Sequence, residues 1–329
     1  MTFKKVIIWG HKLHSHTSSY VHSAFYKAFE YLGYEVHWFD DSDMVIDAQA
    51  QQTIERPEDS PALSESFDFE NSLFITEGQV DKNIPIRQDC HYILHNCYDK
   101  KYDAVKDTSI TLQTYSNKTP KIEGIEKINN YVYIDRSGVY ETIRNPEYES
   151  IPRTTLYMPW ATNLLPHQIN TRPWQSKKNI SNWIGTIGDG LFGNRNELQP
   201  FIDACNNNGI EFKHHANVSE EENMSLISES YLAPAIVGTW QKENGYVPCR
   251  IFKNISYGNL GITNSAEIKM IFGDLVIYSN DESALFDLGR QAIFSDKHND
   301  LLSEQINYVK THHTYLNRIE EILKLINVK

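Results

Sequence analysis

The sequence has few of the features that mark secreted or membrane proteins. Its 329 residues include four cysteines and no C-x-x-C pair, which argues against a disulfide framework and against a zinc site of common spacing. No apolar run approaches the roughly 20 residues that a membrane helix needs. Residues 1–5 lead directly into an apolar strand, without the regions of a signal peptide. These absences predict a cytoplasmic protein with reduced thiols and at most peripheral membrane association.

Positive charge is also in short supply. The 31 Lys and Arg residues face 43 Asp and Glu residues, giving a net charge of −12, so the sequence predicts no nucleic-acid partner held by its phosphates. With 40% hydrophobic and 12% aromatic residues, the chain has ample material for packed cores, which excludes disordered and collagen-like classes. Its length exceeds that of one compact core and predicts two domains.

The first half has the pattern of a parallel α/β sheet. A strand at 5–9, a helix at 19–32 and a strand at 34–39 form a βαβ unit, with Gly33 placed as the helix C-cap. Further short apolar runs predict strands at 72–76, 91–95, 110–114 and 131–134. The polar stretch 44–69 shows no period and is interpreted as an insertion of unreadable role.

The second half repeats this alternation. Strands are expected at 179–185, 210–214, 232–237, 260–264 and 274–278, with helices at about 194–208, 219–229, 282–290 and within 300–327. Prolines punctuate polar sequence between 159 and 178, which indicates an interdomain crossing. The expected fold class is α/β, with two Rossmann-like doubly wound parallel-sheet lobes facing a cleft. The expected domains are 1–170, 171–300 and a terminal helical segment at 301–329 that packs back on the first lobe.

A glycine-rich loop follows the first strand of the second half. Residues 188–193 read Gly-Asp-Gly-Leu-Phe-Gly, and Glu211 lies in the next strand, which resembles a dinucleotide fingerprint. In that fingerprint the first glycine ends the strand, whereas here the strand reaches Gly185 and two residues intervene. We therefore favour a flexible loop that binds an interdomain ligand through Gly185, Thr186, Gly188 and Gly190.

A short helix is predicted just after Gly245. Pro248 suits a first helical turn, where free backbone amides and the helix dipole favour an anion. Arg250 and Lys253 lie three apart, on one helical face. A solvated basic surface is the ordinary alternative for such a pair. The segment predicts an anion site made by Tyr246, Val247, Pro248, Cys249, Arg250 and Lys253.

With this helix placed before a glycine-bounded strand, the chain resembles the nucleotide-sugar glycosyltransferases of the GT-B fold. The similarity is to bacterial and viral enzymes with second lobes like those of glycosyltransferase families 1 and 4. It implies that Arg250 contacts the donor diphosphate and that the chain transfers a hexosyl or deoxyhexosyl group to a hydroxyl of a glycan or small acceptor. Lys253 stands where many relatives have a glutamate for the ribose hydroxyls, so the resemblance does not identify the nucleotide.

Three histidines, His11, His14 and His16, follow the first strand, at the end where open α/β sheets bind ligands. Imidazole can take a proton from a sugar hydroxyl near neutral pH. Since inverting members of this fold often draw their base from this loop, the resemblance implies His16, then His14, as the base of an inverting transfer. His11, Asp40 and Trp160 are expected to contact the acceptor or border the cleft. The alternative to a catalytic role is a polar loop whose histidine side chains form hydrogen bonds with the backbone.

No metal and no cofactor are predicted, the nucleotide sugar being a substrate. Asp40-Asp41-Ser42-Asp43 resembles a metal-binding DxD motif, but it belongs to the wrong lobe for a donor diphosphate. His91 and His95 are interpreted as core residues. Three other functions stay open: a nucleotide-sugar epimerase of the same fold, an NAD-dependent oxidoreductase using Gly188–Gly193, and a non-catalytic sugar-nucleotide binding protein.

Overall fold

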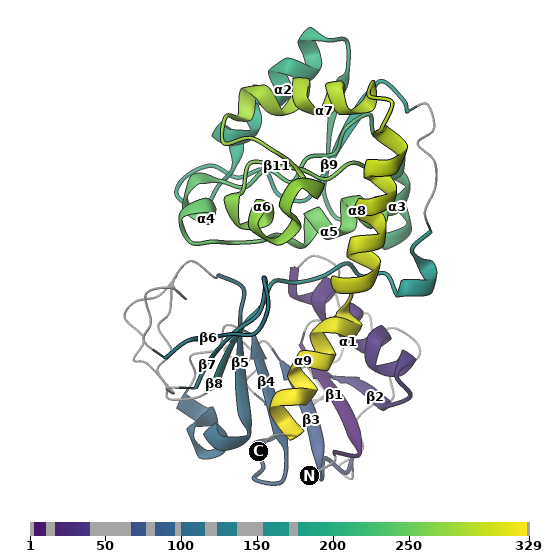
Figure 1. Cartoon of the computed structure of the whole chain (residues 1–329). Helices are drawn as coiled ribbons and strands as arrows, with labels where there is room; N and C mark the ends of the chain where they lie inside the picture. Colours follow the sequence, from purple (N-terminus) through teal and green to yellow (C-terminus); the bar gives the residue numbers. More distant parts are fainter. Residues whose placement is uncertain are drawn as a thin grey trace, which may run out of the picture. The chain divides into compact units, whose positions relative to one another are not determined.

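A computed structural model describes residues 3–10, 17–39, 67–76, 83–95, 100–115, 124–136, 154–170 and 177–327 (Figure 1). The chain divides into two compact units. Unit 1 comprises residues 1–112, 135–156 and 322–329, and unit 2 comprises residues 113–134 and 157–321.

Unit 1 is built on a parallel sheet of buried apolar strands. The strands are β1 (Lys5–Trp9), β2 (Glu35–Phe39), β3 (Ser72–Thr76), β4 (His91–His95) and β5 (Ser109–Gln113), in the order β2-β1-β3-β4-β5. Helix α1 (Thr17–Tyr31) connects the first two strands, and a 3₁₀ segment, η3 (Lys100–Thr108), precedes β5. Gly33 follows α1 with a φ of +85°, the left-handed conformation expected of a C-cap glycine. The predicted βαβ opening is confirmed.

The sheet continues beyond β5 with β8 (Thr154–Tyr157), β7 (Tyr133–Asp135) and β6 (Glu126–Lys127). The strand predicted near 131–134 is formed as β7, and it pairs antiparallel with β6. The connection between them is only five residues and closes through Ile128 N–H donating to the Val132 carbonyl at 2.9 Å. A parallel pair needs a crossover of a dozen or more residues, so this turn enforces the antiparallel arrangement.

Unit 2 contains two parallel strand pairs. The first joins β9 (Ile180–Ile184) to β10 (Glu211–His215), and the second joins β11 (Ile262–Thr263) to β12 (Ile277–Tyr278). The predicted regular strand at 232–237 is not formed; this segment makes a single parallel bridge, between Ala235 and Thr263. Side chains replace part of the ladder there: Ser181 Oγ donates to the Leu232 carbonyl at 2.6 Å and Thr263 Oγ1 to the Ala235 carbonyl at 2.8 Å.

The helices of unit 2 surround these strands and a shared apolar core. Figure 1 shows α2 alongside α7 and α5 alongside α8. The helices are α2 (Arg195–Asn207), α3 (Glu220–Glu229), α4 (Thr239–Glu243), α5 (Cys249–Ser256), α6 (Ala266–Phe272), α7 (Leu285–Ile293) and α8 (His298–His312), with short 3₁₀ turns η5 (Pro166–Gln168), η6 (Gly273–Leu275) and η7 (Glu282–Ala284). The last helix, α9 (Tyr315–Asn327), begins in unit 2 and ends in unit 1. The predicted α/β class is confirmed.

Residues 157–170, expected in the first domain, lie with unit 2. One cause is Arg318, a fully buried side chain of α9 whose Nε donates to the Pro159 carbonyl at 2.9 Å and whose Nη2 donates to the Trp160 carbonyl at 3.0 Å. These bonds tie the 157–161 segment to the start of α9. Of the expected terminal segment, only residues 322–329 belong to unit 1.

Candidate functional site

Arg250, the second residue of α5, is held against the end of β9. Its guanidinium carbon lies 3.8 Å from the centre of the Trp183 ring, and its Nη2 donates to the Ile184 carbonyl at 3.0 Å. Trp183 is only 1% exposed, so the ring is a fixed platform. Burial lowers the pKa of the Arg250 guanidinium, an effect that Cys249 and Tyr246 oppose. The Arg250 side chain therefore links the start of α5 to the end of β9.

Gly185 makes room for that cation. It has a φ of +110°, and a methyl group in place of its hydrogen would lie 2.9 Å from Nη2 of Arg250. Its amide donates to the His215 carbonyl at 3.0 Å, and its carbonyl lies 2.7 Å from Nε2 of His214. A residue other than glycine at this position would be strained and would displace the guanidinium.

The segment before α5 provides the rest of the predicted anion site. Pro248 is the N-cap of α5, so the helix begins just after it, at Cys249. Tyr246 forms an antiparallel bridge with Tyr115, and Val247 is 3% exposed. Lys253 is half-buried, one turn after Arg250. A helix N-terminus beside a cation, at the carboxyl end of a strand, favours an anionic ligand.

The glycine-rich loop folds onto itself. The Gly188 carbonyl accepts bonds from the amides of Asn194 and Arg195 at 3.0 and 3.1 Å, and Asn194 Oδ1 accepts the Gly188 amide at 3.2 Å. A methyl group on Gly193 would collide with the Gly188 carbonyl. The loop expected to be flexible is thus a tight turn, and β9 ends at Ile184, well before the first fingerprint glycine. Thr186 lies between them, exposed, with its carbonyl 3.4 Å from the Trp183 Nε1 donor.

Beside this turn lies a cavity of about 230 Å³, which we call the glycine-loop cavity. Residues of the turn, of the start of α2 and of α4 line it: Gly188, Asp189, Gly190, Leu191, Gly193, Arg195, Asn196, Glu197, Thr239, Trp240 and Glu243. Gly188 and Gly190, which the sequence placed at a ligand, therefore face a hollow, while Gly185 and Arg250 are not part of its lining.

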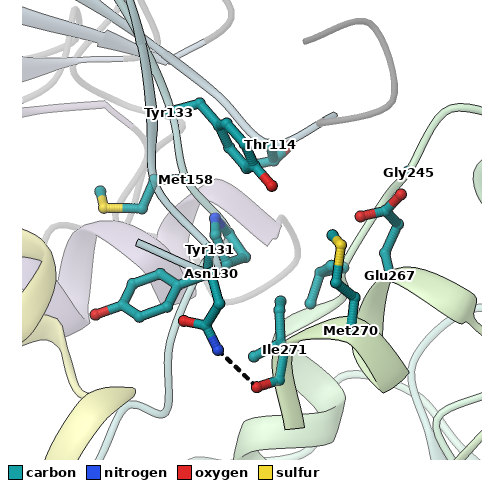
Figure 2. A pocket seen from close by; sticks show the side chains of 11 residues that line it. Thr114, Asn130, Tyr131, Tyr133, Met158, Gly245, Glu267, Met270 and Ile271 are labelled. Atoms are coloured by element: carbon teal, nitrogen blue, oxygen red, sulfur yellow. Dashed lines mark hydrogen bonds between the residues drawn. The ribbon is translucent and has the colours of Figure 1, made fainter. Parts of the chain in front are cut away.

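A second, much smaller cavity, of about 10 Å³, is lined by Glu267 in the first turn of α6 (Figure 2). Figure 2 shows Tyr133 and Glu267 on facing sides of it, and Asn130 donating to the Ile271 carbonyl at 2.8 Å. Burial, with a smaller contribution from the Glu267 carboxylate, raises the pKa of Tyr133. Gly245 and Val247 also line this cavity, so it adjoins the segment that leads to Arg250.

Sequence reasoning missed Glu267. The available signal was its position, three residues after the strand at 260–264 and just after the helix N-cap Ser265, whose side chain accepts the Ile268 amide. It also missed Glu282, whose Oε1 accepts bonds from Lys242 at 2.7 Å and Asn264 at 2.9 Å. Burial would raise the pKa of Glu282, but these bonds outweigh it and lower that pKa.

Several predicted residues lie outside the described part of the chain. These are the predicted base and acceptor-side residues His11, His14, His16 and Asp40, with the neighbouring Asp41 and Asp43. Trp160 is described; it is 2% exposed and lines neither cavity. Of the two histidines expected in the core, His91 is buried and His95 is half-buried.

The end of β1, from which the histidine loop leaves, is well defined. The Gly10 carbonyl accepts a bond from Trp38 Nε1 at 2.9 Å, and a methyl group on Gly10 would lie 2.5 Å from the His22 ring. His22 is 1% exposed and lies edge-on to Trp38. This packing fixes the backbone at Gly10, the last described residue before the predicted histidine loop.

Within the described ranges, no group of three or more His, Cys, Asp or Glu side chains could hold a metal ion. The absence of metal and cofactor stays a prediction, since the Asp40–Asp43 stretch lies outside those ranges. No helix in the described part of the chain is long and apolar enough to cross a membrane.

No protein-family model and no curated protein matches the sequence. Solved structures do match, over almost the whole chain. An alpha-glucosyltransferase in complex with UDP-glucose and DNA containing an abasic site has a TM-score of 0.61 at 10% identity, covering 99% of both chains. An alpha-glucosyltransferase in complex with UDP and a 13-mer DNA containing a HMU base has a TM-score of 0.58 at 9% identity, covering 99% of this chain and 100% of that chain. The N-terminal domain of Candida albicans trehalose-6-phosphate phosphatase has a TM-score of 0.50 at 10% identity, covering 99% and 97%.

These likenesses establish the fold: the chain has the GT-B fold of nucleotide-sugar glycosyltransferases, as predicted. They also correct the exclusion of nucleic acid. Glucosyltransferases of this fold were solved with DNA bound. The net charge of a chain with this fold therefore does not exclude nucleic acid as a partner. The physical reason is that net charge sums over the whole surface, whereas a ligand meets one local patch.

Proposed function

We propose that the chain transfers a hexosyl group from a uridine diphosphate sugar to a hydroxyl group. The observation that carries this proposal is the placement of Arg250: a fixed cation at the start of α5 and the end of β9, in a chain with the GT-B fold. The two glucosyltransferases with the fold hold UDP or UDP-glucose, which suggests the donor.

In this proposal, unit 2 binds the donor. The Arg250 guanidinium and the first amides of α5 offset the charge that grows on the diphosphate as the glycosidic bond to it breaks. Lys253 adds a weaker charge from the next turn.

We propose DNA as the first acceptor to test, because DNA is present in both glucosyltransferase structures. A hydroxyl carried by a base would be the nucleophile. A glycan or small-molecule hydroxyl is the second candidate, because an aromatic ring and several carboxylates line the glycine-loop cavity. Incubation with UDP-[¹⁴C]glucose and either hydroxymethylated DNA or an oligosaccharide mixture separates the two by where the label goes.

The general base is proposed in the histidine loop, with His16 ahead of His14 and an inverting outcome. Removing a general base costs about 10²–10⁴-fold in rate, whereas a histidine that only bonds backbone contributes stability. The kcat of His14→Ala and His16→Ala is to be measured beside their melting temperatures. If both variants turn over within a few-fold of the unaltered protein, the base lies elsewhere.

The same substrates also distinguish the transferase from the competing functions. An epimerase would change the sugar of the donor without an acceptor, and an oxidoreductase would bind NAD at the 188–193 turn. A non-catalytic binding protein would bind UDP-glucose and leave it intact. Release of UDP that depends on an added acceptor is the outcome that only the transferase gives.

A further inference from the structure

The Arg318 guanidinium in α9 is fully buried, and the acceptors of its hydrogen bonds are uncharged. Besides its bonds to the carbonyls of Pro159 and Trp160, its Nη1 donates to the His312 carbonyl at 3.1 Å. A further bond joins Nη2 to Nδ1 of His313 at 3.1 Å. A buried cation that has lost its hydration depends on such bonds, so the position of Arg318 is tied to the groups that accept them.

Aromatic rings enclose this cation and its imidazole acceptor. The guanidinium carbon lies 4.6 Å from the centre of the Tyr131 ring and 5.6 Å from that of Phe252. The His313 ring lies 4.7 Å from each of these two rings and 5.5 Å from the Phe272 ring. We call these five side chains the Arg318 cluster, and all of them belong to unit 2.

The cluster holds the chain where it passes between the two units. Unit 2 comprises residues 113–134 and 157–321, so the chain leaves or enters it at 134, 157 and 321. Tyr131, the carbonyls at 159–160 and Arg318 each lie within three residues of one of these points. One buried cation therefore connects three segments that are distant in the sequence, close to the points where each of them leaves unit 2.

His313 is the acceptor in this cluster that can be protonated. Because an arginine side chain can only donate, Nδ1 of His313 carries no proton and the ring proton is on Nε2. Nε2 is buried and has no hydrogen-bond partner among the residues that the structure describes. A proton on Nδ1 would break the bond to Arg318 and place a second buried cation beside the first. The cluster is therefore closed only while His313 is neutral.

The surroundings of His313 oppose its protonation. The titratable side chains around the ring and its partner are Arg318, His312, Tyr131, Tyr308 and Glu321. Burial lowers the pKa of His313 most, followed by the charge of Arg318 and then that of His312. Tyr131, whose pKa is raised by burial, stays neutral in acid, and the Glu321 carboxylate acts on Arg318. Helices α5 and α6 contribute the apolar rings of Phe252 and Phe272.

We propose that the Arg318 cluster is an acid-sensitive anchor, which releases the chain crossings from unit 2 when His313 takes up a proton. Release frees the 157–162 segment and the start of α9, whereas β9 and β10 keep the ladder bonds that they make with each other. The release itself does not rest on the proposed function. Its consequence for transfer does, because a reaction that needs groups from both units would stop when the crossings are freed.

Hydrogen exchange of the unaltered protein between pH 7.5 and 5 tests the anchor, with the intrinsic pH dependence of exchange divided out. The reporter is the 157–162 segment, where the Thr162 amide donates to the His313 carbonyl at 3.0 Å. Strand β9 is the reference for unfolding of the whole unit. Below about pH 6.5, protection of 157–162 should fall about tenfold per pH unit. It should also lie at least about tenfold below the protection of β9, because a local opening costs less than global unfolding.

Two histidine variants form a matched pair. His313→Gln keeps an acceptor for Arg318 but takes up no proton, so protection of 157–162 should lose its dependence on pH. His298→Gln is the control: His298 is 5% exposed, burial also lowers its pKa, and it lies at the other end of α8, outside the cluster. This variant should keep the pH dependence of the unaltered protein. Melting temperatures show whether each variant folds, and the comparison of 157–162 with β9 in the unaltered protein decides the matter without either.

Three results would overturn the proposal. They are equal protection of 157–162 and β9 at every pH, protection of 157–162 that is constant from pH 7.5 to 5, and the same pH dependence in His313→Gln as in the unaltered protein. The exchange measurement uses no substrate. A failure of UDP to bind would therefore contradict the proposed transferase and leave the anchor standing.

Discussion

The Arg250 guanidinium lies 3.8 Å above the Trp183 ring and is bonded to the carbonyl of the next residue in the strand, Ile184. The stacking and the bond both fix its position, because a planar guanidinium can stack through its face while it donates through its edge. The sequence predicts an anion site at Arg250, and the structure shows which contacts hold the guanidinium in place. Trp183 is a positioning residue for that cation.

Arg250→Ala should weaken binding of UDP at least about tenfold and leave binding of uridine nearly unchanged. A hydrogen bond to a charged group contributes about 1.5–3 kcal/mol. Arg250→Lys should recover only part of this, because an ammonium lacks the planar fork that rests on Trp183. Lys253→Ala should show a similar but smaller loss. Equal UDP affinity in Arg250→Ala and the unaltered protein, measured by calorimetry, would reduce Arg250 to a structural residue.

Gly185→Ala should lose both stability and UDP affinity, because its methyl group would lie 2.9 Å from Nη2 of Arg250. The matched control is Gly209→Ala. Gly209 also has a positive φ, +71°, but its added methyl would meet no described atom within 4 Å. Both variants should carry the backbone cost of about 1–2 kcal/mol, seen as a lower melting temperature. Only Gly185→Ala should also bind UDP more weakly, and similar UDP affinities for the two would contradict the steric argument.

Stability should fall in acid through His313. This side chain is fully buried, and its Nδ1 accepts a bond from Arg318 Nη2 at 3.1 Å. Burial, and then the charge of Arg318, hold the pKa of His313 well below 6.5. The folded state therefore keeps His313 neutral, while the unfolded state takes up a proton below about pH 6.5.

Between about pH 6.5 and 5, this linkage should lower the free energy of unfolding by up to about 1.4 kcal/mol per pH unit. His313→Gln should remove that part of the slope, although it is less stable at pH 7. Urea unfolding of both proteins at several pH values measures the difference. Parallel pH profiles would show that His313 does not titrate as the burial implies.

Transfer should persist in EDTA. Arg250, the α5 amides and Lys253 supply positive charge to the diphosphate, so no divalent cation is required for the leaving group. The measurement is release of UDP with and without chelator. Complete loss of activity in EDTA, restored by manganese or magnesium, would contradict a metal-independent transfer and would favour Asp40, Asp41 and Asp43 as metal ligands.

The strands at 72–76 and 91–95 were predictable to the residue, because fully buried parallel strands are short apolar runs with polar flanks. The segment 232–237 shows the same run, yet it is not a regular strand, since the side chains of Ser181 and Thr263 take over some of its backbone bonds. No periodic pattern shows such a replacement in advance.

The site was predictable only where its chemistry follows a local pattern. Arg250 stood out because it follows Pro248 at a helix start. Glu267 is a single carboxylate in a helical turn, and nothing in its neighbourhood indicates that it lines a cavity with Tyr133 from a distant part of the chain. The exclusion of nucleic acid was unsound because a net charge of −12 contains no information about where the charges lie.

The central claim is that unit 2 binds a nucleoside diphosphate at Arg250. Calorimetry of the unaltered protein and of Arg250→Ala, with UDP, GDP, CDP, dTDP and NAD at fixed ionic strength, tests it most directly. We predict that UDP binds the unaltered protein selectively, that Arg250→Ala binds it at least about tenfold more weakly, and that NAD does not bind. Binding of NAD with no binding of any nucleoside diphosphate would contradict the account.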